Sequence, residues 1–346
     1  MKKVRILSLD GGGIRGIIPA TILKYVEEYL QQKAPGTTIA DHFDFIAGTS
    51  TGGILTCIYL APQEGNKSKA RFTATEALDF YVKEGYNIFN ASKISNWKRL
   101  WGILNATKYS PKCIEDLFKT KFGDIFIDEL MKPCLITTYD MVNKAAVFFT
   151  SLDNTKRKKF YVRDVTRSTS AAPTYFPPAQ INNYAIDAEV TDMINLDGGV
   201  FANNPLMCAY AEVRKLDFET RENKHPTIDS MYILSLGTGG GGFKLSNKEK
   251  SATWGLVKWA KSIPDIMMDG SINTVHYQMN EICKTIPEHA LGDYMRVDVP
   301  QYARDYAPDM SDASPGNIKK LQEAGEKTLE FAKINGLNKF LDGLLD

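Results

Sequence analysis

The pentapeptide Gly48-Thr-Ser-Thr-Gly52 has the composition of a nucleophile elbow. The apolar stretch Phe43–Ala47 before it predicts a short buried strand, and the run 54–60 after it predicts a helix. Glycines on both sides of Ser50 allow the sharp strand-to-helix turn that holds a serine hydroxyl at its tip. The positive end of the helix dipole then favours a developing oxyanion beside this serine. The pentapeptide alone leaves a chance occurrence in a loop equally open.

A second glycine-rich loop, Gly11-Gly-Gly-Ile-Arg-Gly16, directly follows the apolar strand predicted over Val4–Leu9. Its Gly-x-Gly-x-x-Gly spacing formally fits a dinucleotide-binding loop, as in a nucleotide-dependent oxidoreductase. Such a unit needs an acidic residue after its second strand, where this chain has the serine elbow instead.

The other use of such a loop is an oxyanion hole, in which consecutive backbone N–H groups point at one spot. The amides concerned are those of Gly11, Gly12 and Gly13. Arg15 would add charge or hold the loop in shape. A plain tight turn is the third interpretation of these residues.

A serine nucleophile needs a proton acceptor, and Asp197 is the best candidate. It follows the strand predicted over Met193–Leu196 and precedes Gly198 and Gly199. None of the four histidines lies in a glycine-flanked loop, so a surface or structural role is expected for His42, His225, His276 and His289. The sequence therefore predicts a Ser50–Asp197 dyad in place of a Ser–His–Asp triad.

Strands and helices alternate along the chain, which predicts an α/β fold with a largely parallel central sheet. Further helices are predicted over 17–32, 73–88, 113–122, 165–171, 205–216, 251–262, 271–284 and 317–334, and further strands over 133–139, 145–149 and 231–236. Because sites form at the carboxyl ends of strands in such sheets, the glycine loops are expected to converge on one crevice. We see no repeat or long linker, which predicts a single domain over 1–346 with its catalytic motifs within 8–202.

The composition is that of an ordinary globular protein, and the formal net charge of +1 argues against binding of a nucleic-acid polymer. The five cysteines are scattered without metal-site or disulfide spacing, which is typical of a reducing compartment. The N-terminal apolar run, broken by Arg5, is too short for a signal peptide, and no stretch has the length of a membrane span. We expect a cytoplasmic protein whose contact with the inner face of the membrane is peripheral.

Three blocks in this order resemble the patatin-like phospholipase family: 10–16, 48–52 and the Asp-Gly-Gly of 197–199. The similarity continues through Thr169–Pro178, Leu234–Gly239 and Met310–Ser314. The resemblance implies a three-layer α/β/α sandwich and a serine lipid acyl hydrolase that needs no metal or cofactor. It also implies that Ser50 is the nucleophile, that Asp197 is the base and that the first loop forms the oxyanion hole. Plant members often have Asp-Gly-Ala where this chain has Asp-Gly-Gly.

Within this family the chain is similar to bacterial anti-phage phospholipases that a cyclic dinucleotide switches on. If that similarity holds, a second messenger would activate the enzyme, order or oligomerise it, and direct it against membrane in antiviral defence. Two alternatives stay open on the same fold. One is a constitutive, non-specific lipid acyl hydrolase without nucleotide control, and the other is a non-catalytic storage or binding protein.

The segment 90–109 combines one apolar face with basic residues that have no acidic neighbour within the segment. Its apolar side chains at helical spacing are Ile94, Trp97, Trp101 and Leu104. This pattern is typical of a lid or of an interfacial segment on anionic lipid, and packing onto the core is equally open. The basic cluster Lys156–Lys159 is expected to be a solvated loop, and Trp254 and Trp259 are expected to face the core.

Overall fold

The computed structural model describes residues 3–91, 107–152, 158–218, 223–240, 255–285 and 293–345. Most of segment 90–109, and also Trp254, His289, Lys156 and Arg157, therefore lie outside the described residues. Within the described part, an eight-stranded sheet has the order β12-β11-β1-β2-β5-β8-β7, with β6 also paired to β5. Its strands are β1 (Val4–Leu9), β2 (Phe45–Thr49), β5 (Cys134–Asp140), β6 (Ala145–Thr150), β7 (Ala179–Asn182), β8 (Asp192–Asp197), β11 (Met231–Leu236) and β12 (Tyr294–Val297).

The sheet is mixed, with a parallel half and an antiparallel half. β12, β11, β1, β2 and β5 run parallel to one another, whereas β6 and β8 run antiparallel to β5, and β7 runs antiparallel to β8. Two short hairpins lie outside it, β3 (Pro62–Gln63) with β4 (Asn66–Ala70) and β9 (Asp217–Phe218) with β10 (Asn223–Lys224). The predicted α/β class with a mostly parallel central sheet is confirmed.

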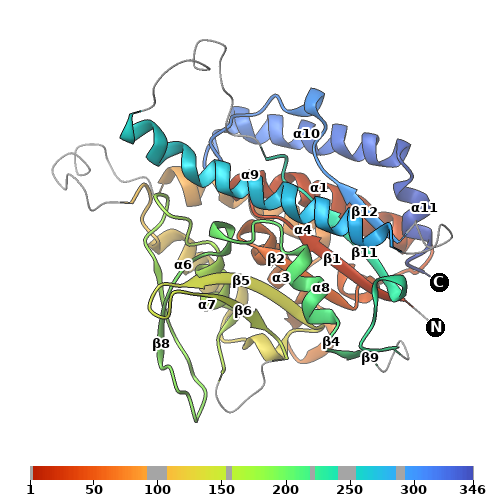
Figure 1. The fold of residues 1–346 in the computed structure, drawn as a ribbon, viewed down its shortest axis with the longest axis horizontal. Helices are drawn as coiled ribbons and strands as arrows, with labels where there is room; N and C mark the ends of the chain where they lie inside the picture. Colours follow the sequence, from red (N-terminus) through yellow and green to blue (C-terminus); the bar gives the residue numbers. More distant parts are fainter. Residues whose placement is uncertain are drawn as a thin grey trace.

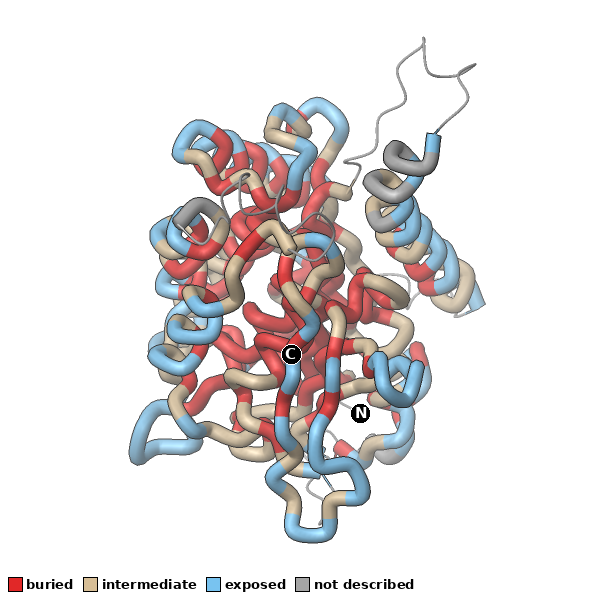
Figure 2. The backbone as a smooth tube through the Cα atoms, turned by 90° about the vertical axis from the view of Figure 1, so that its left-hand side faces the viewer, coloured by how far each residue is buried: buried red, intermediate tan, exposed pale blue. Residues whose placement is uncertain are grey.

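Helices cover both faces of this sheet (Figure 1). One face carries α1 (Ile17–Gln31), α3 (Thr51–Leu60), α4 (Ala74–Tyr86), α6 (Lys112–Phe122), α7 (Val162–Thr169), α10 (Pro315–Ile334) and α11 (Leu337–Asp342). The other carries α8 (Leu206–Val213) and α9 (Leu256–Cys283). The short helix α2 (Ile39–His42) leads into β2. The central strands are buried and the outer turns of the helices are exposed (Figure 2).

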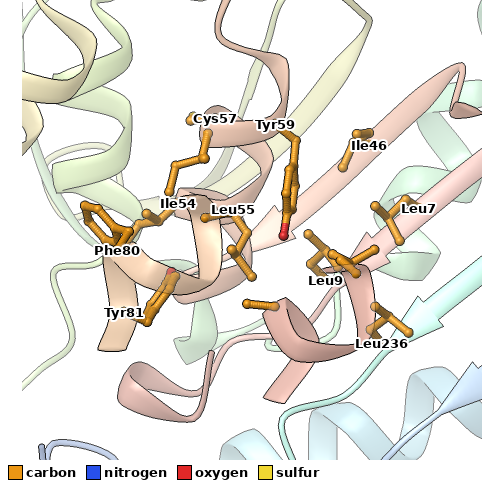
Figure 3. Packing of buried hydrophobic residues seen from close by; sticks show 14 of the residues in the cluster. Leu7, Leu9, Ile46, Ile54, Leu55, Cys57, Tyr59, Phe80, Tyr81 and Leu236 are labelled. Atoms are coloured by element: carbon orange, nitrogen blue, oxygen red, sulfur yellow. The ribbon is translucent and has the colours of Figure 1, made fainter. Parts of the chain in front are cut away.

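The helix that follows the serine elbow is buried along its whole length. Every residue of α3 is buried, between the sheet on one side and α4 on the other. Figure 3 shows Ile54 and Leu55 of this helix between the rings of Phe80 and Tyr81 and the strand residue Leu9. This packing fixes the position of the helix that carries the turn at Ser50.

Helix α9 differs from its prediction, because one continuous helix replaces the two expected over 251–262 and 271–284. Pro264 and Gly270 lie inside it, and the helix continues through both. A proline removes one backbone hydrogen bond from a helix, which does not outweigh the bonds and packing of 28 residues. Trp259 on this helix is 46% exposed, so the expectation that it faces the core is wrong.

No helix among the described residues is both long enough and apolar enough to cross a membrane.

Candidate active site

Ser50 occupies the strained turn predicted for a nucleophile. Its backbone has φ 54° and ψ −121°, a conformation that costs a non-glycine residue of the order of 1–3 kcal/mol. A Cβ on Gly52 would lie 2.1 Å from the Leu9 carbonyl oxygen, so only glycine allows the new helix to approach β1 so closely. The Ser50 N–H donates to the Thr169 hydroxyl at 2.8 Å, which holds the tip of the turn in place.

Asp197 lies beside Ser50 and is buried, with 4% of its surface exposed. Burial raises the pKa of this carboxyl to about 7, while hydrogen bonds from the Ser50 side chain and the Gly199 N–H oppose the rise. The Gly199 bond is 2.7 Å long and goes to Oδ1. In the described part of the chain no basic side chain pairs with this carboxyl. A buried carboxylate without a cation partner can accept a proton near neutral pH.

The chain delivers Asp197 to the serine from an unexpected direction. β8 runs antiparallel to β5, so Asp197 does not stand at the carboxyl edge of a parallel strand. Instead, β8 begins beyond the end of β5 and runs back until Asp197 is opposite Thr138. The preceding residue of β5, Thr137, is the register partner of Thr49, the last residue before Ser50. The loops at Gly11–Gly16, Ser50 and Asp197 lie together as predicted. The loop at Asp197 reaches the other two because β8 is antiparallel to β5 and offset along it.

The amide of Gly11 is not available to an oxyanion. It donates to the Asn203 carbonyl at 2.9 Å. Of the three amides predicted for the oxyanion hole, those of Gly12 and Gly13 remain. The Gly11 carbonyl is also fixed, because it accepts bonds from the Thr238 hydroxyl at 2.6 Å and from Asn203 Nδ2 at 3.3 Å. Since the C=O and N–H of a trans peptide point in opposite directions, these two bonds also fix the direction of the Gly12 N–H.

Arg15 fixes the next peptide in the same way. Its Nε and its backbone N–H both donate to the Gly12 carbonyl, at 3.3 Å and 3.2 Å, which sets the direction of the Gly13 N–H. Gly13 has φ 59°, and a Cβ there would lie 2.3 Å from the Met310 carbonyl oxygen, so the turn requires glycine. Neither the Gly12 nor the Gly13 N–H has an acceptor among the described residues.

A buried ion pair fixes Asp10, the residue before the Gly11–Gly16 loop. Arg296 of β12 makes two hydrogen bonds to Asp10, at 2.9 and 2.6 Å, and one to Asp298 at 3.0 Å. Burial raises the pKa of Asp10 to about 6, and the Arg296 guanidinium opposes the rise. Asp298 in turn accepts the Gly239 N–H at 2.9 Å, which ties the loop after β11 to the same cluster.

Two cavities meet at Ser50. The first, the α3–α4 cavity, measures ≈ 50 Å³. Its apolar walls are Ile14, Ile54, Phe80, Ile88, Ile114 and Phe176. The second, the α9 cavity, measures ≈ 210 Å³. Besides Ser50, it is lined by Gly12, Asp197, Asn203 and the α9 residues Ile263, Met267 and Met268.

The described histidines have other partners. His42 lies 2.8 Å from the Thr37 hydroxyl, His225 lies 3.3 Å from the Arg214 carbonyl oxygen, and His276 lies 3.0 Å from the Tyr294 hydroxyl. In the ranges that the structure describes, no cluster of three or more His, Cys, Asp or Glu side chains could hold a metal ion.

The sequence analysis missed the residues that hold the first loop from a distance. Thr238 and Asn203 both bond to Gly11, and Arg296 bonds to Asp10 across 286 positions. Thr238 does stand in a glycine-containing loop after a buried strand, which is the signal that could have found it. The distant contact of Arg296 leaves no local signal.

Comparison with known proteins gives one consistent family. The family model described as "Patatin-like phospholipase" matches residues 7–210. "Patatin-like protein 2" of Oryza sativa subsp. indica is 32% identical over 350 residues, covering 95% of this chain and 84% of the relative. "Patatin-2-Kuras 3" of Solanum tuberosum is 31% identical over 337 residues, covering 94% and 84%. A solved structure of VipD from Legionella pneumophila covers 96% of this chain and 67% of its own at 12% identity, with a TM-score of 0.34, too low to support a conclusion.

Proposed function

The chain belongs to the patatin-like phospholipase family and is a lipid acyl hydrolase, and we propose that it cleaves acyl esters of glycerophospholipids through a Ser50–Asp197 dyad. The observation that carries the dyad is the buried carboxyl of Asp197, which has a pKa of about 7 and is hydrogen-bonded by the Ser50 side chain. A group with that pKa is half ionised near neutral pH, which suits a general base.

In the acylation step, Ser50 Oγ attacks the ester carbonyl carbon while its proton passes to Asp197. The negative charge that develops on the carbonyl oxygen is stabilised by the N–H groups of Gly12 and Gly13, which have no other acceptor among the described residues. The C–O bond to the alcohol then breaks, and the leaving oxygen takes the proton from Asp197. The products of this step are the acyl-serine and a lysophospholipid.

Deacylation repeats the sequence with water. Asp197 accepts a proton from the water as its oxygen attacks the acyl carbon, and the bond to Ser50 Oγ breaks. The proton returns to Oγ, and a free fatty acid leaves. Every proton in both steps is carried by Asp197, so the mechanism needs no histidine.

The test is product analysis by mass spectrometry with a mixed phospholipid substrate. We expect free fatty acid and lysophospholipid in equal amounts from the wild-type enzyme, and neither from the Ser50→Ala variant. Equal product release by folded Ser50→Ala protein would contradict the proposed nucleophile. A wild-type enzyme that releases no acyl group from any phospholipid would contradict the proposed substrate class.

Peripheral contact with a phospholipid surface is the second part of the proposal. The amino-terminal half of α9 exposes four large apolar side chains: Trp259, Ile263, Ile266 and Met267. An exposed apolar face of this kind favours insertion at the lipid interface. Because Ile263 and Met267 also line the α9 cavity, the exposed face leads directly to Ser50.

The matched variants for this contact are Trp259→Glu and Tyr277→Glu, which place the same charge at two exposed positions of one helix. With Ser50→Ala in both backgrounds, we expect Trp259→Glu to weaken sedimentation with phosphatidylcholine–phosphatidylglycerol vesicles at least fivefold and Tyr277→Glu to have little effect. Equal binding by the two variants would contradict the assignment of this face.

Control by a cyclic dinucleotide, with a role in antiviral defence, rests on the family resemblance alone. The same is true of the proposed oligomerisation, whereas a cytoplasmic location is the expectation from the composition of the sequence. Measuring vesicle hydrolysis with and without a panel of cyclic dinucleotides tests the control directly. A rate that no member of the panel changes would favour the constitutive hydrolase.

A further inference from the structure

One of the residues that line only one of the two cavities at Ser50 decides their roles in catalysis. Both are lined by Ser50, but Asp197 lines only the α9 cavity. We propose that the α3–α4 cavity binds the scissile acyl chain and that the α9 cavity binds the leaving alcohol, which is the lysophospholipid. This assignment rests on the proposed function and adds a location for each half of the substrate.

The stereochemistry of the tetrahedral intermediate supports this division. Its carbon carries Ser50 Oγ, the oxyanion, the acyl chain and the leaving oxygen. The leaving oxygen must receive its proton from Asp197, so it lies within hydrogen-bonding reach of that carboxyl. The acyl chain must then extend away from Asp197, and the α3–α4 cavity is the one at Ser50 that Asp197 does not line.

The walls of the α3–α4 cavity fit an acyl chain. None of its lining residues carries a charge, and the six apolar residues named above are at most 6% exposed. Ile54 and Phe80, which Figure 3 shows side by side, form part of these walls. An uncharged, apolar cavity of ≈ 50 Å³ suits the methylene groups nearest to the ester carbonyl.

The walls of the α9 cavity fit the leaving alcohol and the incoming water. This cavity is about four times as large as the first, and its α9 residues Ile263 and Met267 are 44% and 52% exposed. It therefore opens towards the surface, where a glycerophosphate head group can stay hydrated. Asn203 also lines this cavity, and its side-chain amide donates to the Gly11 carbonyl at 3.3 Å, which ties this wall to the first glycine loop.

Crossed substrate series test the assignment. One series varies the acyl chain from butyryl to palmitoyl with p-nitrophenol as the constant leaving group. The other keeps an octanoyl chain and compares methyl octanoate with dioctanoyl phosphatidylcholine below its micellar concentration. The variants are Ile114→Trp, which fills the α3–α4 cavity, and Met267→Trp, which fills the α9 cavity. Tyr277→Trp, on the exposed face of α9 outside both cavities, is the control.

We expect Ile114→Trp to lower kcat/KM for the palmitoyl ester relative to the butyryl ester at least tenfold. The ratio of kcat/KM for dioctanoyl phosphatidylcholine to that for methyl octanoate should stay within twofold of wild type. Met267→Trp should lower this second ratio at least fivefold and leave the ratio of palmitoyl to butyryl ester within twofold of wild type. Should Ile114→Trp fail to fold, Phe80→Leu enlarges the same cavity and should shift the chain-length optimum towards longer esters.

An active enzyme in which Met267→Trp changes the chain-length preference and the α3–α4 variant changes the leaving-group ratio would overturn the assignment. Equal effects of both variants on both ratios would overturn it as well. A wild-type enzyme that hydrolyses none of these esters would instead overturn the proposed function.

Discussion

Asp10 and Asp197 have the same local sequence but different surroundings. Asp10 directly follows β1 and Asp197 ends β8, each is followed by two glycines, and they are 0% and 4% exposed. Asp10 lies against the Arg296 guanidinium, whereas no described basic side chain pairs with Asp197. Burial raises the pKa of both, to about 6 and about 7. A buried Asp-Gly-Gly is therefore structural where a cation compensates it and is suited to proton transfer where none does.

The largest effect is expected from removing the uncompensated carboxylate. Asp197→Asn keeps the acceptor for the Gly199 N–H but cannot take the serine proton. We expect kcat/KM for p-nitrophenyl butyrate to fall by at least about 10³-fold, in line with the loss of a catalytic aspartate elsewhere. Circular dichroism checks that the variant is folded. A folded variant with more than a tenth of wild-type activity would show that both aspartates are structural.

Removing the compensated carboxylate should act on stability. Asp10→Asn leaves the buried Arg296 with Asp298 as its remaining carboxylate partner. Breaking one side of a buried ion pair costs about 3–5 kcal/mol of unfolding free energy, which urea denaturation measures. A loss below about 1 kcal/mol would mean that the Asp10–Arg296 ion pair contributes little to the stability of the fold.

The loop that follows Asp10 should respond to the loss of one hydroxyl. Thr238→Val removes the 2.6 Å bond to the Gly11 carbonyl and leaves the Gly12 peptide less well oriented. We expect kcat to fall roughly 10–100-fold with KM within twofold, because the oxyanion bond matters most in the transition state. Thr328→Val is a suitable control, since its buried hydroxyl donates to the Ala324 carbonyl within its own helix and has no other partner among the described residues. Equal losses in the two variants would indicate a general packing effect.

The smallest effect concerns the stability cost of Asp197 itself. Its pKa is raised on folding from 3.8 to about 7, so the folded state is penalised once the carboxyl ionises. This penalty is absent below pH 4, grows as the pH rises to about 7 and is constant above that. Asp197→Asn should therefore be more stable than wild type by roughly 1–3 kcal/mol at pH 8.5, and by less at pH 5.5. Thermal unfolding at the two pH values measures this difference, and a pH-independent difference would refute the raised pKa.

Local patterns were enough to predict most of the fold and the sharp turn at Ser50. The strands around the glycine loops are short apolar runs, and the turn at Ser50 needs the glycines that flank it, so both are visible within a few residues. α9 was predicted in two pieces because Pro264 and Gly270 weaken a helix locally, whereas its continuity is set over 28 residues.

Contacts between distant segments could not be predicted in the same way. The antiparallel offset that brings Asp197 to Ser50 depends on pairing between β5 and β8. The use of the Gly11 amide by Asn203, and the compensation of Asp10 by Arg296, join positions 192 and 286 residues apart. These contacts decide which amides and which carboxylate are free for catalysis, and the single sequence contains no local sign of them.

The pH dependence of Ser50 labelling by a fluorophosphonate probe tests the central claim most directly, because it reports activation of the serine without a lipid substrate. With Asp197 as the base, the second-order labelling rate should be level above pH 7 and fall about tenfold for each pH unit below it. The Asp197→Asn variant should label very slowly at every pH. A wild-type rate that is constant from pH 5 to pH 9, or an Asp197→Asn variant that labels at the wild-type rate, would contradict the dyad.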